Sequence, residues 1–293
     1  MDSKKARLRK LLRSTTFAYV APLRNSEATK CREILEAVAC PFVVHLWDLS
    51  DRALNEDYAW LFFHAERVFC LSASMADEIC LMSPCKASFL AFVRPPSKFR
   101  SAFDSAGELK IALIGFLQTY QDGLILLSRA IENLGSTFAK IRLIYIGPPA
   151  QLKYIPSPLG HITEYEGCLD DESRDRALAA CHIAYLPGPL LPPDTDLKSK
   201  HSIPSRMADY LAVGLPVVAA AHPHSATAHF FSTIRGRGFF PVSDPEDIQC
   251  VFRELTNKTS WLNAAQECAT FYSAHFDTSN ALGELASLVS RFV

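Results

Sequence analysis

The run from Pro204 to Ala220 constrains the fold more than any other part of this chain. Its first half repeats apolar residues at helical spacing, Gly214 would end that helix, and the apolar Val217–Ala220 suits a strand covered on both faces. Ser202 is the expected N-cap, and the free backbone N–H groups after it would suit a phosphate. A helix that turns through a glycine into a buried strand indicates an α/β protein.

Apolar runs and helical periods alternate along the whole chain, which predicts parallel sheets with crossover helices. The expected strands are 17–21, 41–47, 67–71, 87–92, 109–116, 141–147, 161–165, 183–187, 217–220 and 238–242. The expected helices include 27–39, 57–64, 74–81, 124–134, 171–181 and 245–257. The segment 94–106 contains Pro95 and Pro96 and is interpreted as a linker.

This order predicts two doubly wound domains, each with its ligand site outside the carboxyl ends of its strands. We expect an abbreviated N-terminal domain over residues 1–106 and a second domain over 107–274. A helix within 275–293 is expected to pack back toward the first domain.

Composition excludes several classes of protein. The 30 Lys and Arg against 31 Asp and Glu exclude a generally basic, nucleic-acid-coating chain. Nine cysteines without a Cys-x-x-Cys pair favour free, buried thiols in a reducing cytosol, and no spacing suggests a metal site. No apolar run is long enough to span a bilayer, so we expect a cytoplasmic protein. The basic segment Lys4–Arg13 suits either the inner face of a membrane or a solvated terminus.

The run 204–220 resembles the donor-site signature of the GT-B glycosyltransferases, especially their large retaining family four. Residues 111–115 and 123–130 resemble the first strand, glycine loop and helix of the donor domain of that family. Residues 179–187 and 238–248 resemble later parts of the same domain. In the first part of the chain, 41–48 and 68–72 are similar to the later half of an acceptor domain. The resemblance implies a GT-B-like fold with two Rossmann-like domains.

The resemblance also implies a set of donor-binding residues. Asp209 matches a glutamate of the family that accepts hydrogen bonds from the ribose hydroxyls of the donor. The alternative interpretation is that Asp209 forms an ion pair with Arg206 on an exposed helix face. Arg206 matches a cation near the diphosphate. The remaining candidates for the donor site are Gly115, Phe116, Gly167, Cys168, Lys200, His201, Ser205 and His222. His45, Asp48 and His201 are weak candidates for catalysis. We expect His45, Asp48 and Asp51 to lie at the carboxyl end of a buried strand, where one of them could orient an acceptor hydroxyl. The alternative is a strand-end residue, Asp51 or Ser50, that caps the next helix.

Two departures from the family pattern stand out. His201, with seven residues between it and Asp209, replaces a glutamate that contacts the donor sugar. Phe116 and Gln121 or Asp122 replace an Arg and a Lys that contact the diphosphate. Two lost charge-assisted hydrogen bonds would cost about 1.5–3 kcal/mol each in donor affinity. Compensation by Lys198, Lys200 and Arg206 is one interpretation, and a site that no longer works as the family's does is the other.

The leading hypothesis is a retaining, metal-independent glycosyltransferase that uses a nucleotide-sugar donor and no cofactor. Its acceptor would be a polysaccharide, a glycolipid or a metabolite, presented as a sugar, a lipid-linked sugar or a small molecule. The alternative is a non-catalytic GT-B-like subunit, in a homo- or hetero-oligomer, that partners an active enzyme. A nucleotide-sugar epimerase is a third interpretation, although no acid–base set for it is evident. The short first domain also fits a reading frame that begins late.

Overall fold

The computed structural model describes residues 12, 14–47, 54–90, 92–103, 108–134, 140–233 and 238–292. Contacts between residues divide the chain into two units. The first unit contains Met1–Ala91, Lys200–Ser202 and Ala281–Val293, and the second contains Phe92–Ser199 and Ile203–Asn280. This division differs from the expected boundary at 106, because the linker segment is bonded to the second unit. The basic segment Lys4–Arg13 and the residues Asp48 and Asp51 lie outside the described residues.

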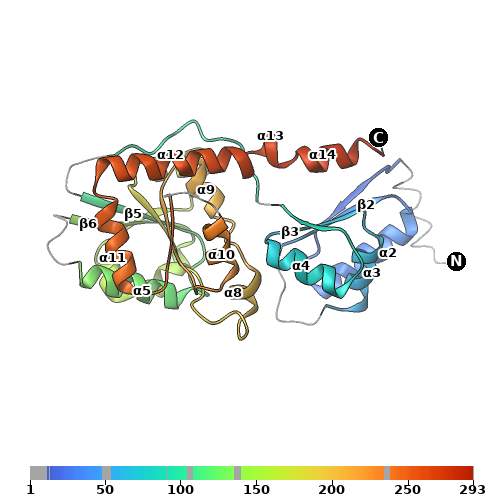
Figure 1. Cartoon of the computed structure of the whole chain (residues 1–293), viewed down its shortest axis with the longest axis horizontal. Helices are drawn as coiled ribbons and strands as arrows, with labels where there is room; N and C mark the ends of the chain where they lie inside the picture. The colour runs from blue at the N-terminus through green and yellow to red at the C-terminus, as the bar shows by residue number, and fades with distance from the viewer. Residues whose placement is uncertain are drawn as a thin grey trace. The chain divides into compact units, whose positions relative to one another are not determined.

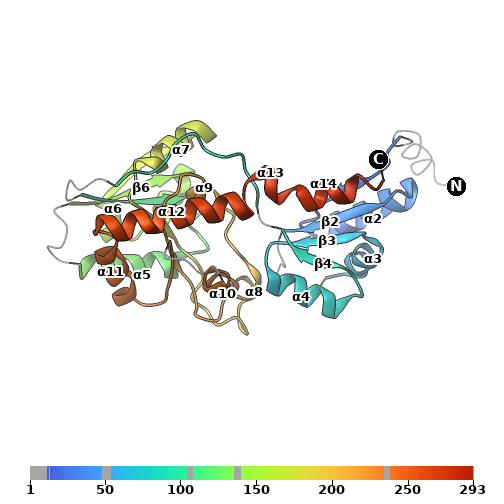
Figure 2. The ribbon, with the colours of Figure 1, turned by 45° about the horizontal axis from the view of Figure 1, so that its top comes forward.

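The first unit is built on a four-stranded parallel sheet in the order β1-β2-β3-β4. Figure 1 labels two of these strands, β2 and β3. Its strands are β1 (Ala18–Val20), β2 (Phe42–Leu46), β3 (Arg67–Cys70) and β4 (Ala87–Phe89). Its helices are α2 (Asn25–Val38), α3 (Glu56–His64), α4 (Ala73–Met82) and α14 (Gly283–Val289). Side chains alternate between the two faces of a strand, so β2 buries Val44 with α3 and α4 and buries Val43 with α14. Figure 2 shows α14 on the face of this sheet opposite α3 and α4.

The second unit contains a six-stranded parallel sheet in the order β10-β9-β8-β5-β6-β7. Its strands are β5 (Glu108–Ile114), β6 (Lys140–Ile146), β7 (Thr163–Gly167), β8 (Ile183–Leu186), β9 (Val217–Ala220) and β10 (Phe239–Val242). Its helices are α5 (Gln121–Glu132), η2 (Pro149–Tyr154), α6 (Ser157–Gly160), α7 (Asp171–Ala179), α9 (Met207–Ala212), α10 (Ala226–Thr233), α11 (Pro245–Glu254) and α12 (Lys258–His275). The short helices α8 (Leu197–His201) and α13 (Thr278–Ala281) lie where the chain passes between the units.

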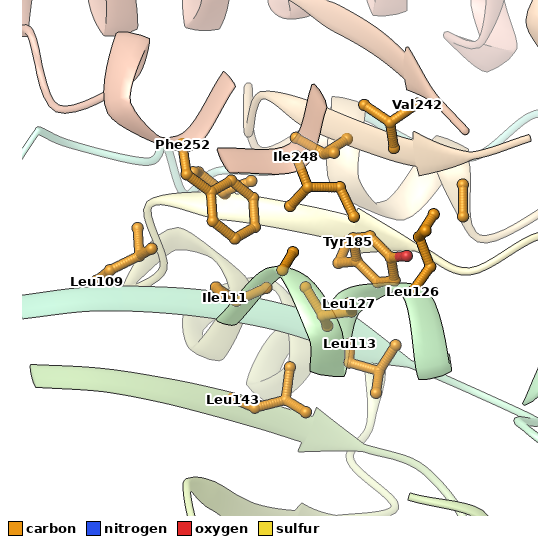
Figure 3. Packing of buried hydrophobic residues seen from close by; sticks show 14 of the residues in the cluster. Leu109, Ile111, Leu113, Leu126, Leu127, Leu143, Tyr185, Val242, Ile248 and Phe252 are labelled. Carbon is orange, nitrogen blue, oxygen red and sulfur yellow. The ribbon is translucent and has the colours of Figure 1, made fainter. Parts of the chain in front are cut away.

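The main core of the second unit lies between this sheet and the helices α5 and α11. Leu109, Ile111 and Leu113 project from one face of β5 toward Leu127 of α5 and Ile248 of α11 (Figure 3). These residues of β5 alternate with Ala112 and Ile114, which are buried on the other face. A strand covered on both faces is apolar on both, which is why Ile111–Ile114 is a continuous apolar run, whereas Glu108 and Lys110 at the start of β5 are only half-buried.

Most expected strands and helices occur within a few residues of their predicted bounds, and the expected pair of parallel α/β domains is confirmed. The main exception is the predicted helix after Ser202. The helix α9 begins only at Met207, and Arg206 is its N-cap. Ser202 is therefore not the cap. The reason is Pro204, because the residue before a proline is disfavoured in helical conformation and Ile203 cannot continue a helix from Ser202.

Candidate functional site

The strand order of the second unit places its topological switch point at the carboxyl ends of β5 and β8. From these adjacent strands, the sheet continues in one direction through β6 and β7 and in the other through β9 and β10. The loops that follow the two strands therefore diverge, and ligands of doubly wound proteins bind at such a switch point. The candidate residues Gly115 and Phe116 directly follow β5, which places them at this point.

The loop after β5 is held in place by side chains from other elements. Gly115 has a φ of +92°, which is strained for any residue with a Cβ. The Tyr145 hydroxyl donates to the Gly115 carbonyl at 2.9 Å, and the Tyr210 hydroxyl accepts from the Ile114 N–H at 3.0 Å. Burial raises the pKa of Tyr145 to about 12, so its phenol keeps the proton that it donates. The loop is a preorganised backbone turn.

Gln151 of η2 supports the same loop and was missed by the sequence reasoning. Its buried side-chain oxygen Oε1 accepts hydrogen bonds from the N–H groups of Leu117 at 2.9 Å and Gln118 at 3.1 Å. The sequence signal that could have indicated Gln151 is its place shortly after the Gly-Pro-Pro that starts at Gly147, directly after a strand. The backbone after Gly115 thus has its direction fixed by an amide from a different loop.

Arg206 reaches this loop from the start of α9. Its Nη1 donates to the Ile114 carbonyl at 2.7 Å and is 3.4 Å from the Phe116 carbonyl. Its guanidinium carbon lies 4.6 Å from the ring centroid of Tyr120, a cation–π geometry. A guanidinium has five N–H donors in a planar fork. The structure therefore places a cation beside Gly115.

Asp209 has partners that the sequence did not indicate. Its Oδ1 accepts from Arg94 Nη1 at 2.8 Å and from Arg174 Nη2 at 3.0 Å. The alternative interpretation, in which Asp209 forms an ion pair with Arg206 on an exposed helix face, is not what the structure shows. Arg206 precedes the helix, and Asp209 lies in its first turn, directed toward the linker and α7.

Lys200 and His201 belong to the first unit. The Lys200 ammonium is paired with Glu78 of α4, and His201 Nε2 lies 3.3 Å from the same carboxylate oxygen. Lys200 lowers the pKa of Glu78, while burial lowers the pKa of His201, so a neutral His201 beside a charged Glu78 follows. The side chain of Lys198 lies outside the described part of the chain. Lys198, Lys200 and Arg206 were expected to compensate for the missing arginine and lysine. Among the side chains that the structure describes, Arg206 contacts the loop after β5 and Lys200 contacts Glu78 instead.

His45 is a buried residue of the first unit. It lies within β2 and not after it, with 5% of its surface exposed, and the Tyr19 hydroxyl is hydrogen-bonded to its Nδ1. Burial lowers the pKa of His45 to about 4. The expectation that this side chain projects from the end of a strand is wrong, since alternation along β2 directs it into the core beside Phe69.

The other candidates lie at the carboxyl edge of the second sheet. Gly167 ends β7 with a φ of +88°, its carbonyl accepts from the Gly147 N–H at 2.9 Å, and Cys168 beyond it is exposed. His222 follows β9, where its Nδ1 accepts from the His224 N–H at 3.2 Å. Ser205 is exposed in the turn before α9. These residues present backbone groups and hydroxyl, thiol and imidazole side chains along one edge.

The structure also bears on metals, membranes and thiols. Across the described residues, no three His, Cys, Asp or Glu side chains group in a way that could hold a metal ion. Within that same part of the chain, no helix combines the length and apolarity needed to cross a membrane. All nine cysteines are free, as expected, but the expectation of burial holds only for Cys70, Cys181 and Cys268.

Comparisons with solved structures identify the fold. HepE of Anabaena in complex with UDP-glucose matches with a TM-score of 0.71 at 12% identity, over 98% of this chain and 82% of that chain. The fold is that of the GT-B glycosyltransferases. The trehalose 6-phosphate synthase of Burkholderia multivorans matches this GT-B chain with a TM-score of 0.69 at 11% identity, over 98% of the chain and 73% of the synthase. TarM of S. aureus in complex with UDP has a TM-score of 0.66 at 11% identity, with coverages of 97% and 57%.

The sequence itself gives no such match. Neither models of protein families nor curated proteins match it. The resemblance read from the run 204–220 is confirmed by the structural neighbours, and at these identities they establish the fold and leave the chemistry to the residues described above.

Proposed function

We propose that this protein is a glycosyltransferase that binds a nucleotide-sugar donor in the second unit. The observation that carries the proposal is the Arg206 guanidinium beside Gly115, at the switch point of the doubly wound sheet. The planar guanidinium of an arginine can donate two parallel hydrogen bonds to two oxygens of a phosphate, and a diphosphate is a better leaving group when its charge is neutralised. The structural neighbours support a donor of this class, because several were crystallised with UDP or UDP-glucose.

Roles for the other candidates follow from their places. Gly115 and Gly167 are half-buried and lack a side chain, so the diphosphate and the base can approach the main chain closely there, and His222 offers an imidazole to the sugar. We propose transfer with retention, with the leaving phosphate taking the acceptor proton, and no resident metal or cofactor. The acceptor belongs to the sugars, lipid-linked sugars or small molecules, and the reaction is placed in the cytoplasm.

The test is a calorimetric titration of the protein with UDP, GDP, ADP and CMP, without metal and then with magnesium. We expect micromolar binding of one nucleotide. Arg206→Ala should weaken that binding by about tenfold or more, because it removes charge-assisted hydrogen bonds to phosphate. Arg253→Ala is the matched control, since Arg253 is exposed on α11 of the same unit. An unchanged nucleotide affinity in Arg206→Ala would contradict the proposal that Arg206 binds the diphosphate.

A non-catalytic nucleotide-binding subunit is the second candidate. Phe116, 67% exposed at the end of β5, favours it, because an apolar ring stands where the family has a phosphate-binding arginine. Donor turnover separates the two functions. An enzyme should release the nucleotide from its nucleotide sugar, either by transfer or by slow hydrolysis, and the anomeric configuration of the product reports retention. Tight binding with no release over many hours would favour the subunit.

A further inference from the structure

The linker that begins the second unit is fastened by a buried cluster of four charges. Arg94 Nη2 donates to both carboxylate oxygens of Asp175 at 2.7 and 2.8 Å, and its Nη1 donates to Asp209 at 2.8 Å. Arg174 of α7 donates to the same oxygen of Asp209. The side chains of Arg94, Asp175 and Asp209 are 14%, 7% and 21% exposed. Removing one partner would leave another charge buried and unpaired.

The backbone of the linker is bonded as firmly as its side chains. The Tyr272 hydroxyl donates to the Arg94 carbonyl at 2.7 Å, and the Arg94 N–H donates to the Phe276 carbonyl at 3.1 Å. Further along, the Ser101 N–H and hydroxyl both donate to the Val213 carbonyl, at 2.8 and 3.1 Å. The linker is thus bonded at both ends of α9, through Asp209 at its start and Val213 at its end.

These contacts conflict with the role that resemblance gives Asp209. A carboxylate that binds both hydroxyls of a ribose uses both of its oxygens, but Oδ1 of Asp209 already accepts from two guanidinium groups. Burial raises the pKa of Asp209 and outweighs the two arginines, which lower it. We propose that Asp209 anchors the linker through Arg94 to the helix that follows Arg206, and that it does not bind the ribose.

Through this anchor, nucleotide binding at the donor site would restrain the linker. Arg206 caps α9 and Asp209 lies in its first turn, so a phosphate bound at Arg206 restrains the helix that holds the linker. This step rests on the proposed function, whereas the anchor itself does not. Nucleotide binding is therefore expected to slow hydrogen exchange in residues 92–103 of the wild type and to lose this effect in Asp209→Asn.

The experiment combines hydrogen exchange with nucleotide titration of the full chain. Asp209→Asn, and Arg94→Met separately, should each speed exchange in residues 92–103 by about tenfold or more, and the double variant should add little, since both break one cluster. Arg94→Lys keeps the charge without the planar fork and serves if the methionine variant does not fold. Asp171→Asn is the control, because Asp171 contacts Arg174 but is 89% exposed.

The ribose role is tested with UDP and 2′,3′-dideoxy-UDP. The affinity lost on removing the two hydroxyls should be the same in the wild type and in Asp209→Asn. If that loss vanishes in Asp209→Asn, Asp209 binds the ribose and the anchor proposal is overturned. Unchanged exchange in both Asp209→Asn and Arg94→Met would also overturn it. If the wild type binds no nucleotide, the proposed function fails, and faster exchange in the two variants still supports the anchor.

Discussion

Arg206 and Asp209 lie three positions apart, and their side chains reach different parts of the second unit. Arg206 bonds to the loop after β5, whereas Asp209 bonds to the linker and to α7. A cation and a carboxylate were expected at this site, but their partners are distant in sequence. Ile114, which accepts from Arg206, and Arg94, which donates to Asp209, each lie more than 80 positions from the residue that they contact. At the scale of residues, partners fix the role of a charged group, because a carboxylate oxygen held by two guanidinium groups is not available to a ligand.

His45 provides a prediction at this scale. Its pKa is lowered by burial to about 4, so as pH falls below about 6.5 the unfolded chain binds a proton that the folded chain refuses. The contribution of neutral His45 to the free energy of unfolding is therefore fully present above about pH 6.5. It is lost as the pH falls toward 4, by up to about 3 kcal/mol. Urea unfolding at pH 7 and 4.5 should show a smaller pH-dependent loss in His45→Gln than in the wild type. Equal losses in the two proteins would contradict it.

Close approaches of backbone hold the elements around the switch point. Gly123 lies in the first turn of α5 against the loop after β8, where an added Cβ would lie 3.0 Å from the Gly188 N–H nitrogen. A Cβ on Gly188 would overlap the carbonyl oxygen of Ala220, at the end of β9. The loop after β8 is therefore in main-chain contact with the last residue of β9. At the scale of elements, the shape of the candidate site depends on glycines that no charge pattern reveals.

Gly188→Ala should consequently destabilise the second unit by about 1–3 kcal/mol, since backbone must move to admit the methyl group. It should also weaken nucleotide binding if the proposed site is correct. Gly160→Ala is the control, because nothing lies within 4 Å of its added Cβ. Thermal unfolding of the two variants measures the difference. A Gly188→Ala protein as stable as Gly160→Ala would mean that the contact with Ala220 is not tight.

Segments distant in sequence complete each unit of the whole molecule. Leu288 of α14 packs with Val43, Phe69 and Leu90 of the first unit, and Lys200–Ser202 joins the same unit. A first unit that depends on the end of the chain cannot finish folding until that end is available. This arrangement also divides the segment predicted as a C-terminal helix between the two units.

Leu288→Ala should destabilise the first unit by about 2–5 kcal/mol, because it removes a buried leucine from a small cluster. Leu81→Ala, at a leucine 89% exposed on α4, should change stability little. Hydrogen exchange during urea unfolding reports the two units separately. Selective loss of protection in β2 and β3 of Leu288→Ala would confirm the dependence, and equal effects of the two variants would contradict it.

The sequence by itself determined the order and type of most elements, the parallel sheets and the resemblance to a GT-B donor domain. Local pattern suffices there, because apolar periodicity and glycine or proline punctuation act over a few residues. Only the tertiary structure decided that α9 starts after Arg206, that His45 is buried and that Asp209 belongs to Arg94 and Arg174. The physical reason is that ion pairs and burial depend on segments brought together by folding, and one sequence carries no record of those distances.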